Sequence, residues 1–79
     1  MLEESADRTA FEVIGDAGPG FLAQLTSVIA RHSGDITLVE IIESVPPDSR
    51  IYFEIDLPGD SAALAAEMRS LPVVREVAI

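Results

Sequence analysis

Residues 13–23 read Val13-Ile14-Gly15-Asp16-Ala17-Gly18-Pro19-Gly20-Phe21-Leu22-Ala23. An apolar run stops at a short glycine-rich turn, and a helical pattern starts directly after it. Pro19 suits the first turn of a helix, where the missing N–H of proline costs no hydrogen bond. The segment therefore predicts a strand that passes through a tight turn into a helix.

The helix predicted after this turn has an apolar face. Leu22, Leu25 and Ile29 recur at helical spacing, which is typical of one face packed on a core. Gly34 follows the last apolar residue of the pattern, and we expect it to end the helix in a left-handed conformation. The preceding strand is expected at residues 9–14.

Strand and helix patterns continue to the end of the chain. They predict a strand at 35–45, a turn at 46–49, a strand at 50–57, a helix that begins near residue 61 and a last strand at 73–79. Asp60 or Ser61 can cap the second helix, and Pro72 ends it. The strand at 50–57 is the clearest, because its apolar and polar residues alternate.

The order β-α-β-β-α-β indicates an α+β, ferredoxin-like sandwich. A four-stranded antiparallel sheet would carry both helices on one face. We expect residues 1–8 to form a flexible N-terminal tail and residues 9–79 to form the single domain that a 79-residue chain allows.

The strand at 35–45 does not show a simple alternation. Ile36 and Leu38 lie on one parity, whereas Val39 and Ile41 lie on the other. Either both faces of this strand are covered, or a bulge near residues 39–40 switches its register. In the first case an exposed apolar patch on this strand would be a dimer contact.

Composition excludes several classes of protein. The chain has no cysteine, which removes disulfides, thiolate metal sites and thiol chemistry, and a cytoplasmic location is the default. The net charge of −9, with five arginines and no lysine, argues against nucleic acid and anionic membranes as partners. A domain this small has a thin stability margin, which pairing with a second copy would widen.

The glycine-rich turn is the best candidate for a binding site. The free N–H groups at a helix start, together with the helix dipole, favour an anion such as the carboxylate of an amino acid. Gly18 and Gly20 would let a ligand approach the backbone closely. The alternative is a plain strand-to-helix turn that needs glycine only for its geometry.

Other polar residues have simpler interpretations. His32, the only histidine, is expected to complement the helix dipole rather than to act in catalysis or bind a metal. Glu40, Glu43, Glu54 and Asp56 lie on neighbouring predicted strands, and a solvated acidic face is favoured over a cation site. No serine has an evident base, so no catalytic residue, metal site or cofactor is predicted.

These features together resemble the ACT domain, a small regulatory domain. The resemblance rests on Asp16-Ala17-Gly18-Pro19-Gly20-Phe21-Leu22, on Gly34-Asp35-Ile36 at the start of the next strand, and on the element order of residues 9–79. It implies a non-catalytic module that binds a small metabolite, with an amino acid expected. Two copies would pair, often side by side, and control an attached or partner metabolic enzyme.

The resemblance also implies which residues bind the effector, between the first loop of one copy and the second strand of the other. They are Asp16, Ala17, Gly18, Gly20, Phe21 and Leu22 on one side, with Asp35, Ile36 and Leu38 on the other. Gly18 and Gly20 would offer backbone contacts, and Asp35 would take an ammonium group. The sequence departs from serine-binding relatives, because Gly15, Ala17 and Asp35 stand where those have polar side chains such as histidine and asparagine.

Three functions therefore remain to be compared. The first is the effector-binding module, and the second is a pure dimerisation module without a ligand, whose segment 34–44 is faintly similar to the front of malic-type enzymes. The third is an enzyme on the same fold, such as an acylphosphatase. That resemblance implies an arginine in the loop and an asparagine, and this chain has no arginine in its loop and no asparagine at all.

Overall fold

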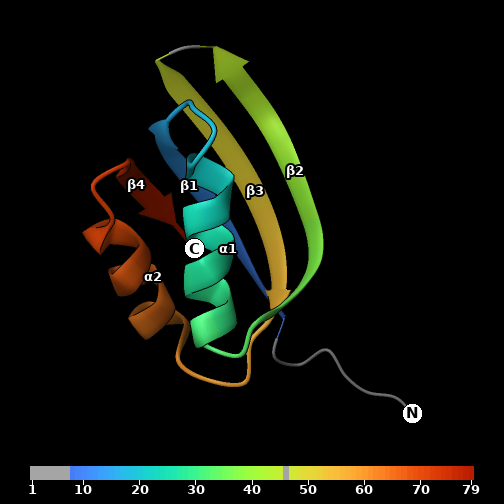
Figure 1. Cartoon of the computed structure of the whole chain (residues 1–79). Coiled ribbons are helices and arrows are strands. Elements are labelled where there is room, and N and C mark those ends of the chain that lie inside the picture. The colour runs from blue at the N-terminus through green and yellow to red at the C-terminus, as the bar shows by residue number, and fades with distance from the viewer. Residues whose placement is uncertain (1–7, 46) are drawn as a thin grey trace.

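The computed structural model describes residues 8–45 and 47–79. Its elements are β1 (Arg8–Asp16), α1 (Phe21–Arg31), β2 (Asp35–Val45), β3 (Asp48–Asp56), α2 (Ser61–Ser70) and β4 (Val74–Ala78). Neighbouring strands are antiparallel in the order β2-β3-β1-β4, and both helices lie on one face of the sheet (Figure 1). The predicted ferredoxin-like sandwich is confirmed. The expected tail falls on residues 1–7, which lie outside the described residues, and on Arg8, which already belongs to β1.

The core lies between the sheet and the two helices. Every second residue of β1 and β3 points towards the helices, because successive side chains of a strand alternate between its faces. The largest fully buried side chains are Phe11, Val13, Leu25, Val28, Ile29, Ile51, Phe53, Ile55, Leu64 and Met68. Burial of large aliphatic and aromatic groups on this scale is the main stabilising contribution to the fold.

The end of α1 differs from the prediction. Ser33, not Gly34, adopts the left-handed conformation, with φ of 60°, and no glycine among the described residues has a positive φ. The amide of Gly34 donates to the Ile29 carbonyl and that of Ser33 donates to the Ala30 carbonyl, which is the Schellman arrangement. Position 34 requires glycine for a steric reason instead, because a Cβ there would lie 2.8 Å from Ile29 and 2.9 Å from Ile55.

The two helices begin differently. Of the two residues expected to cap α2, Asp60 is the cap, because its carboxylate accepts the amide hydrogen of Ala62 at 2.9 Å. Gly20 is the cap residue of α1 and offers no side chain, and Pro19 lies before the helix rather than in its first turn. The first amides of α1 therefore receive no help from a capping side chain.

Two bulges resolve the mixed parity of β2. Its register against β3 shifts at Thr37 and again at Ile42, and neither shift falls at the expected residues 39–40. The Thr37 hydroxyl donates to the Glu54 carbonyl at the first bulge. Val39 pairs with Phe53 and Ile41 pairs with Ile51, so both side chains lie on the helix side of the sheet.

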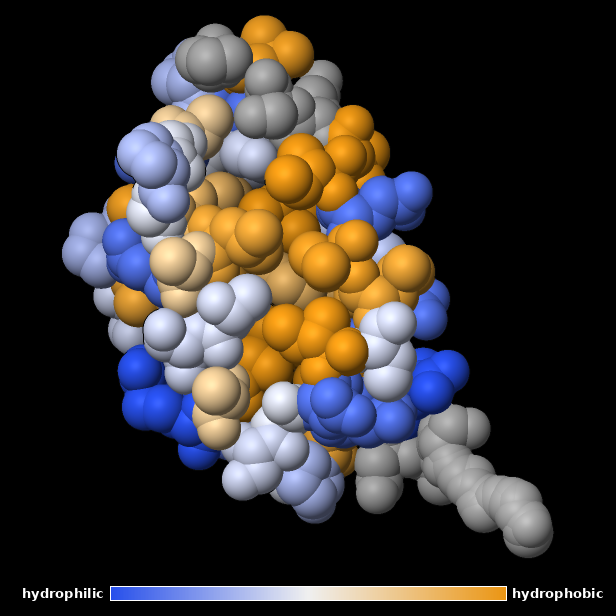
Figure 2. Space-filling model, turned by 45° about the vertical axis from the view of Figure 1, so that its right-hand side comes forward, coloured by the Kyte–Doolittle hydropathy of each residue, from blue (hydrophilic) through white to orange (hydrophobic). Residues whose placement is uncertain are grey.

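These side chains remain exposed because the helices do not extend over the edge strand. Figure 1 shows α1 in front of β1 and β3, with β2 beyond it. The exposed large apolar residues of β2 are Leu38, Val39, Ile41, Ile42 and Val45. Figure 2 shows that hydrophobic surface is continuous over this side of the molecule. We call these five residues the β2 patch, because exposed apolar side chains that gather along one edge strand are typical of an interaction surface.

Candidate functional site

The loop between β1 and α1 is shaped by contact between Gly15 and Phe21. A Cβ at Gly15 would lie 2.3 Å from the Val73 carbonyl oxygen and 2.6 Å from the Phe21 ring. The Phe21 ring therefore occupies the space beneath the strand end, and its side chain is buried. Of the predicted ligand contacts, Phe21 belongs to the core, and only its backbone faces the loop.

Two backbone hydrogen bonds hold the loop to its neighbours. The amide of Asp16 donates to the Val73 carbonyl, and the amide of Ala17 donates to the Pro47 carbonyl, both at 2.9 Å. The first bond joins the loop to the segment before β4. The second joins it to the turn between β2 and β3, so the loop and this hairpin form one surface.

The far side of the loop is open. Nothing lies within 4 Å of a Cβ placed on Gly18, and both Gly18 and Gly20 are exposed. Among the described residues, none accepts a hydrogen bond from the amides of Gly18, Gly20, Leu22 or Ala23. The first turn of α1 holds no acidic residue. This group of unpaired amides at a helix start favours an anionic group such as a carboxylate.

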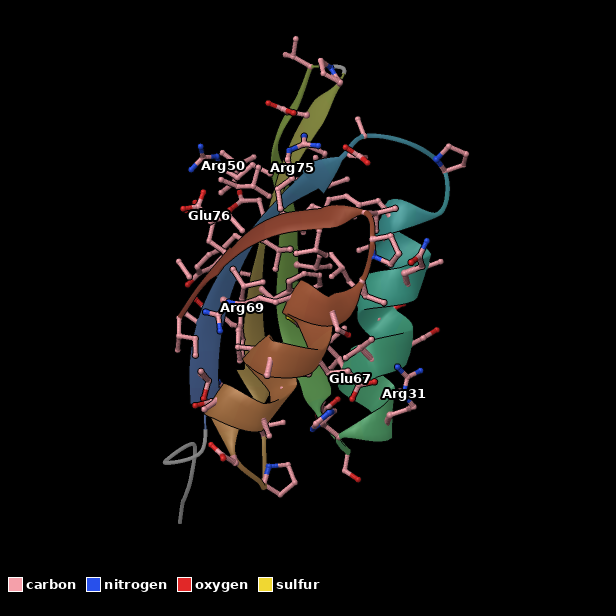
Figure 3. All side chains as sticks on the ribbon, turned by 90° about the vertical axis from the view of Figure 1, so that its left-hand side faces the viewer. Arg31, Arg50, Glu67, Arg69, Arg75 and Glu76 are labelled. Atoms are coloured by element: carbon pink, nitrogen blue, oxygen red, sulfur yellow. The ribbon has the colours of Figure 1, made fainter. Side chains whose placement is uncertain are left out.

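An arginine that was not predicted lies beside the loop. Arg75 of β4 donates hydrogen bonds to the carboxylates of Asp16 and Asp48, and to the Gly15 carbonyl at 3.2 Å (Figure 3). Asp16 is therefore ion-paired within the chain rather than free for a ligand. Sequence spacing held no signal for this cluster, because the four residues come from three strands that only the fold brings together.

The predicted residues on β2 lie at the opposite end of the sheet. Asp16 is level with Asp48, whereas Asp35 is level with Asp56, eight positions further along β3. That separation is roughly 26 Å at the rise of an extended strand. Asp35 and Leu38 are exposed, and Ile36 packs against the core. One chain therefore does not bring the two predicted halves of the site together.

The remaining polar groups form structural pairs. Glu67 of α2 bonds to Arg31 and to Nε2 of His32, at 2.7 Å for the histidine, and these bonds lower the pKa of the Glu67 carboxyl (Figure 3). The histidine thus joins the end of α1 to α2. The Tyr52 hydroxyl donates to Glu54 at 2.7 Å, which raises the pKa of the tyrosine.

The acidic residues considered as a cation site are dispersed. Asp56 pairs with Arg8 at one end of the sheet, and Glu54 is engaged by Tyr52. Within residues 8–45 and 47–79, no three histidine or acidic side chains are grouped closely enough to hold a metal ion. The side chain of Glu43 lies outside the described part of the chain.

Two surface hollows lie away from the loop. One, of about 230 Å³, lies between the helices and is lined by Ala23, Gln24, Ser27, Val28, Arg31 and Leu71. The other, of about 330 Å³, lies on the uncovered face of the sheet and is lined by Ala10, Phe11, Glu12, Tyr52, Ala78 and Ile79. Neither hollow includes the open amides of the loop.

The fold is that of a known class of domain. No family model matches this sequence, and no curated protein is similar to it. Among solved structures, the ACT domain of GTP pyrophosphokinase from Chlorobium tepidum superposes with a TM-score of 0.74 at 16% identity, covering 90% of this chain and 94% of that one. The predicted resemblance to ACT domains is thus confirmed at the level of the fold.

Two further structures share the arrangement. The C-terminal domain of the MgtC protein from Mycobacterium tuberculosis matches with a TM-score of 0.72 at 14% identity, over 99% of this chain and 89% of that one. A homoserine dehydrogenase from Thiobacillus denitrificans matches with a TM-score of 0.67 at 26% identity, over 94% of this chain but 17% of the dehydrogenase. In all three neighbours the fold is one domain of a larger protein. No helix in the described residues is long and apolar enough to span a membrane.

Proposed function

We propose that this chain is a non-catalytic regulatory module that binds a small carboxylate-bearing metabolite, an amino acid above all, between two copies of itself. Binding would control an attached or partner metabolic enzyme in the cytoplasm. The observation that carries the proposal is the open β1–α1 loop, where the amides of Gly18, Gly20, Leu22 and Ala23 have no acceptor among the described residues. Its fold, shared with the ACT domain of a GTP pyrophosphokinase, supports a regulatory role.

A second copy would complete the site. If two β2 edges paired antiparallel about a two-fold axis, the start of one strand would lie beside the end of the other. Asp35 of one copy would then approach the Val45 end of its neighbour, which lies level with Asp48 in the register. The Ala17–Pro47 hydrogen bond holds that same end to the loop. The predicted ammonium partner would thus meet the predicted carboxylate site across the interface.

The same pairing would cover apolar surface. The β2 patch would be buried by the neighbouring copy, and at about 25 cal/mol per Å² even a few hundred Å² would offset much of the cost of association. The bulges at Thr37 and Ile42 leave four regular residues between them, 38–41, for strand pairing. We infer that side-chain packing, more than a long ladder, holds the pair together.

A pure dimerisation module is the second candidate. It is favoured by the Arg75–Asp16 ion pair, which occupies the one charged side chain of the predicted loop site. It is also favoured by Ala17, Gly18 and Gly20, which provide no side-chain hydrogen bonds. In this case the β2 patch would still be buried, and the loop would bind nothing.

One experiment separates these functions. The protein is melted alone and with each of the twenty amino acids, and its mass in solution is measured. A ligand at a hundredfold excess over its Kd stabilises the folded state by about 2.7 kcal/mol, which is a clear shift in melting temperature. A dimer that shifts with an amino acid supports the module. A dimer that shifts with none supports dimerisation alone, and a monomer that shifts with none excludes both.

A further inference from the structure

We infer that Arg75 is a positioning residue that couples the β1–α1 loop to the hairpin between β2 and β3. Its guanidinium donates to the Gly15 carbonyl and the Asp16 carboxylate on one side and to the Asp48 carboxylate on the other. The regulatory meaning of this coupling rests on the proposed function. The coupling itself is a property of the single chain and is tested without any ligand.

The geometry requires an arginine. Three acceptors on two different strands surround one side chain, and the guanidinium presents five donors in a planar fork, whereas a lysine ammonium is a compact point charge. Asp16 and Asp48 face each other in the β1–β3 register and would repel each other without a cation between them. Arg75 therefore converts a repulsive pair into a link between two strand ends.

This link sets the position of the loop. Asp16 is the last residue of β1, and Ala17 is the first residue of the loop that carries the open amides. The Ala17 amide bonds to the Pro47 carbonyl, one residue before Asp48. Arg75 and this backbone bond thus hold the same two segments together. Loss of the Arg75 ion pairs would therefore expose the Ala17–Pro47 hydrogen bond to solvent.

The coupling gives the edge strand a route to the loop. Asp48 is paired in register with Val45, the last residue of β2 and part of the β2 patch. A partner that shifts the end of β2 would move Asp48, and through Arg75 it would move Asp16 and the loop. Binding at the loop would act on the edge strand by the same path, because coupling between two sites is reciprocal.

The test is amide hydrogen exchange on Arg75→Met, with Arg50→Met as the matched control. Arg50 is similarly exposed and pairs with Glu12 at 3.2 Å, and within the described residues no hydrogen bond or ion pair joins its side chain to the loop. We expect the Ala17 amide to exchange about tenfold faster in R75M, while core amides such as that of Phe53 keep their rates. R50M should leave the Ala17 amide unchanged. High salt should speed exchange at Ala17 in the unaltered protein and have little effect in R75M.

Two further variants distinguish a local effect on the loop from a general loss of folding. Asp48→Asn removes the negative charge on the hairpin side of the link and should also speed exchange at Ala17. Arg75→Lys keeps the positive charge and should retain part of the protection that R75M loses. If all amides change equally, or if Ala17 keeps its rate in both R75M and D48N, the inference is wrong. If Ala17 responds as expected but no amino acid shifts the melting temperature of the parent protein, the coupling stands and the proposed ligand fails.

Discussion

The ring of Phe21 fills the space that a side chain at position 15 would need. An added Cβ at Gly15 would lie 2.6 and 2.8 Å from two ring carbons of Phe21, and 2.3 Å from the Val73 carbonyl oxygen. Contacts this short force a shift of backbone as well as of side chain. Gly15 thus fixes where β1 ends, and with it the place of the loop over the start of α1.

Gly15→Ala should destabilise the domain by about 2 kcal/mol, because overpacking against backbone cannot be relieved by a rotamer change. For a chain of this size the melting temperature should fall by roughly 10 °C. Thermal and urea denaturation provide the measurement. Gly18→Ala is the control, since nothing lies within 4 Å of its added Cβ, and it should leave stability within about 0.5 kcal/mol. Equal losses in both variants would contradict the packing argument.

Two substitutions at the C-terminal end of α1 should change stability in opposite directions. Ser33→Gly should stabilise the protein by about 0.5 kcal/mol, because glycine adopts the observed φ of 60° without steric cost. This net value allows for the larger conformational entropy that glycine gives the unfolded chain. Gly34→Ala should destabilise it, because the new methyl group would meet Ile29 and Ile55 at under 3 Å. Urea midpoints of the two variants should move in opposite directions. If both variants are destabilising, Gly34 rather than Ser33 is the left-handed cap residue in solution, and a neutral G34A would refute the close contacts of position 34 with Ile29 and Ile55.

The contacts of Glu67 with Arg31 and His32 make part of the folding stability depend on pH in the acid range. Its folded-state pKa is lowered below the ordinary 4.5, chiefly by the hydrogen bond from Arg31 and then by that from His32. A carboxyl with a depressed folded pKa contributes stability above its unfolded pKa, and this contribution is lost as pH falls through the folded value. Glu67→Gln should therefore lower stability near neutral pH and flatten its decline below about pH 4.5. Glu76→Gln, at an exposed site that forms no ion pair within the described residues, is the control, and an equal flattening in that variant would refute the role of the contacts with Arg31 and His32.

The β2 patch predicts where association is sensitive to mutation. Ile41→Glu places a charge on the helix side of the edge strand, at a side chain that is 57% exposed, and should weaken self-association at least tenfold. Ile79→Glu is the control, because Ile79 is 62% exposed but lies beyond β4 at the other edge of the sheet. Sedimentation equilibrium compares the two. Equal effects, or a parent protein that is monomeric at every concentration, would refute β2 as the interface.

Local patterns were enough for the elements and their order. The alternation of Ile51, Phe53 and Ile55 with polar neighbours specifies a strand with one buried face, and the spacing of Leu25 and Ile29 specifies the face of α1. Periodicity is carried by residues close in sequence, so it can be read before folding. The glycine-rich turn and the start of α2 are equally local, so the turn was predicted and the cap of α2 was narrowed to Asp60 or Ser61, of which Asp60 is the cap.

Contacts between distant segments lay beyond any such pattern. Ser33 adopts the left-handed conformation, and the glycine at position 34 is required because a side chain there would clash with Ile29 and Ile55. The bulges of β2 depend on its pairing with β3, and the loss of a free Asp16 depends on Arg75, 59 residues away. Local residue patterns are sufficient to specify a βαββαβ chain with an open turn before its first helix. Which side chains contact one another at that turn follows only from the folded chain, because those contacts depend on strand register and packing that no local spacing encodes.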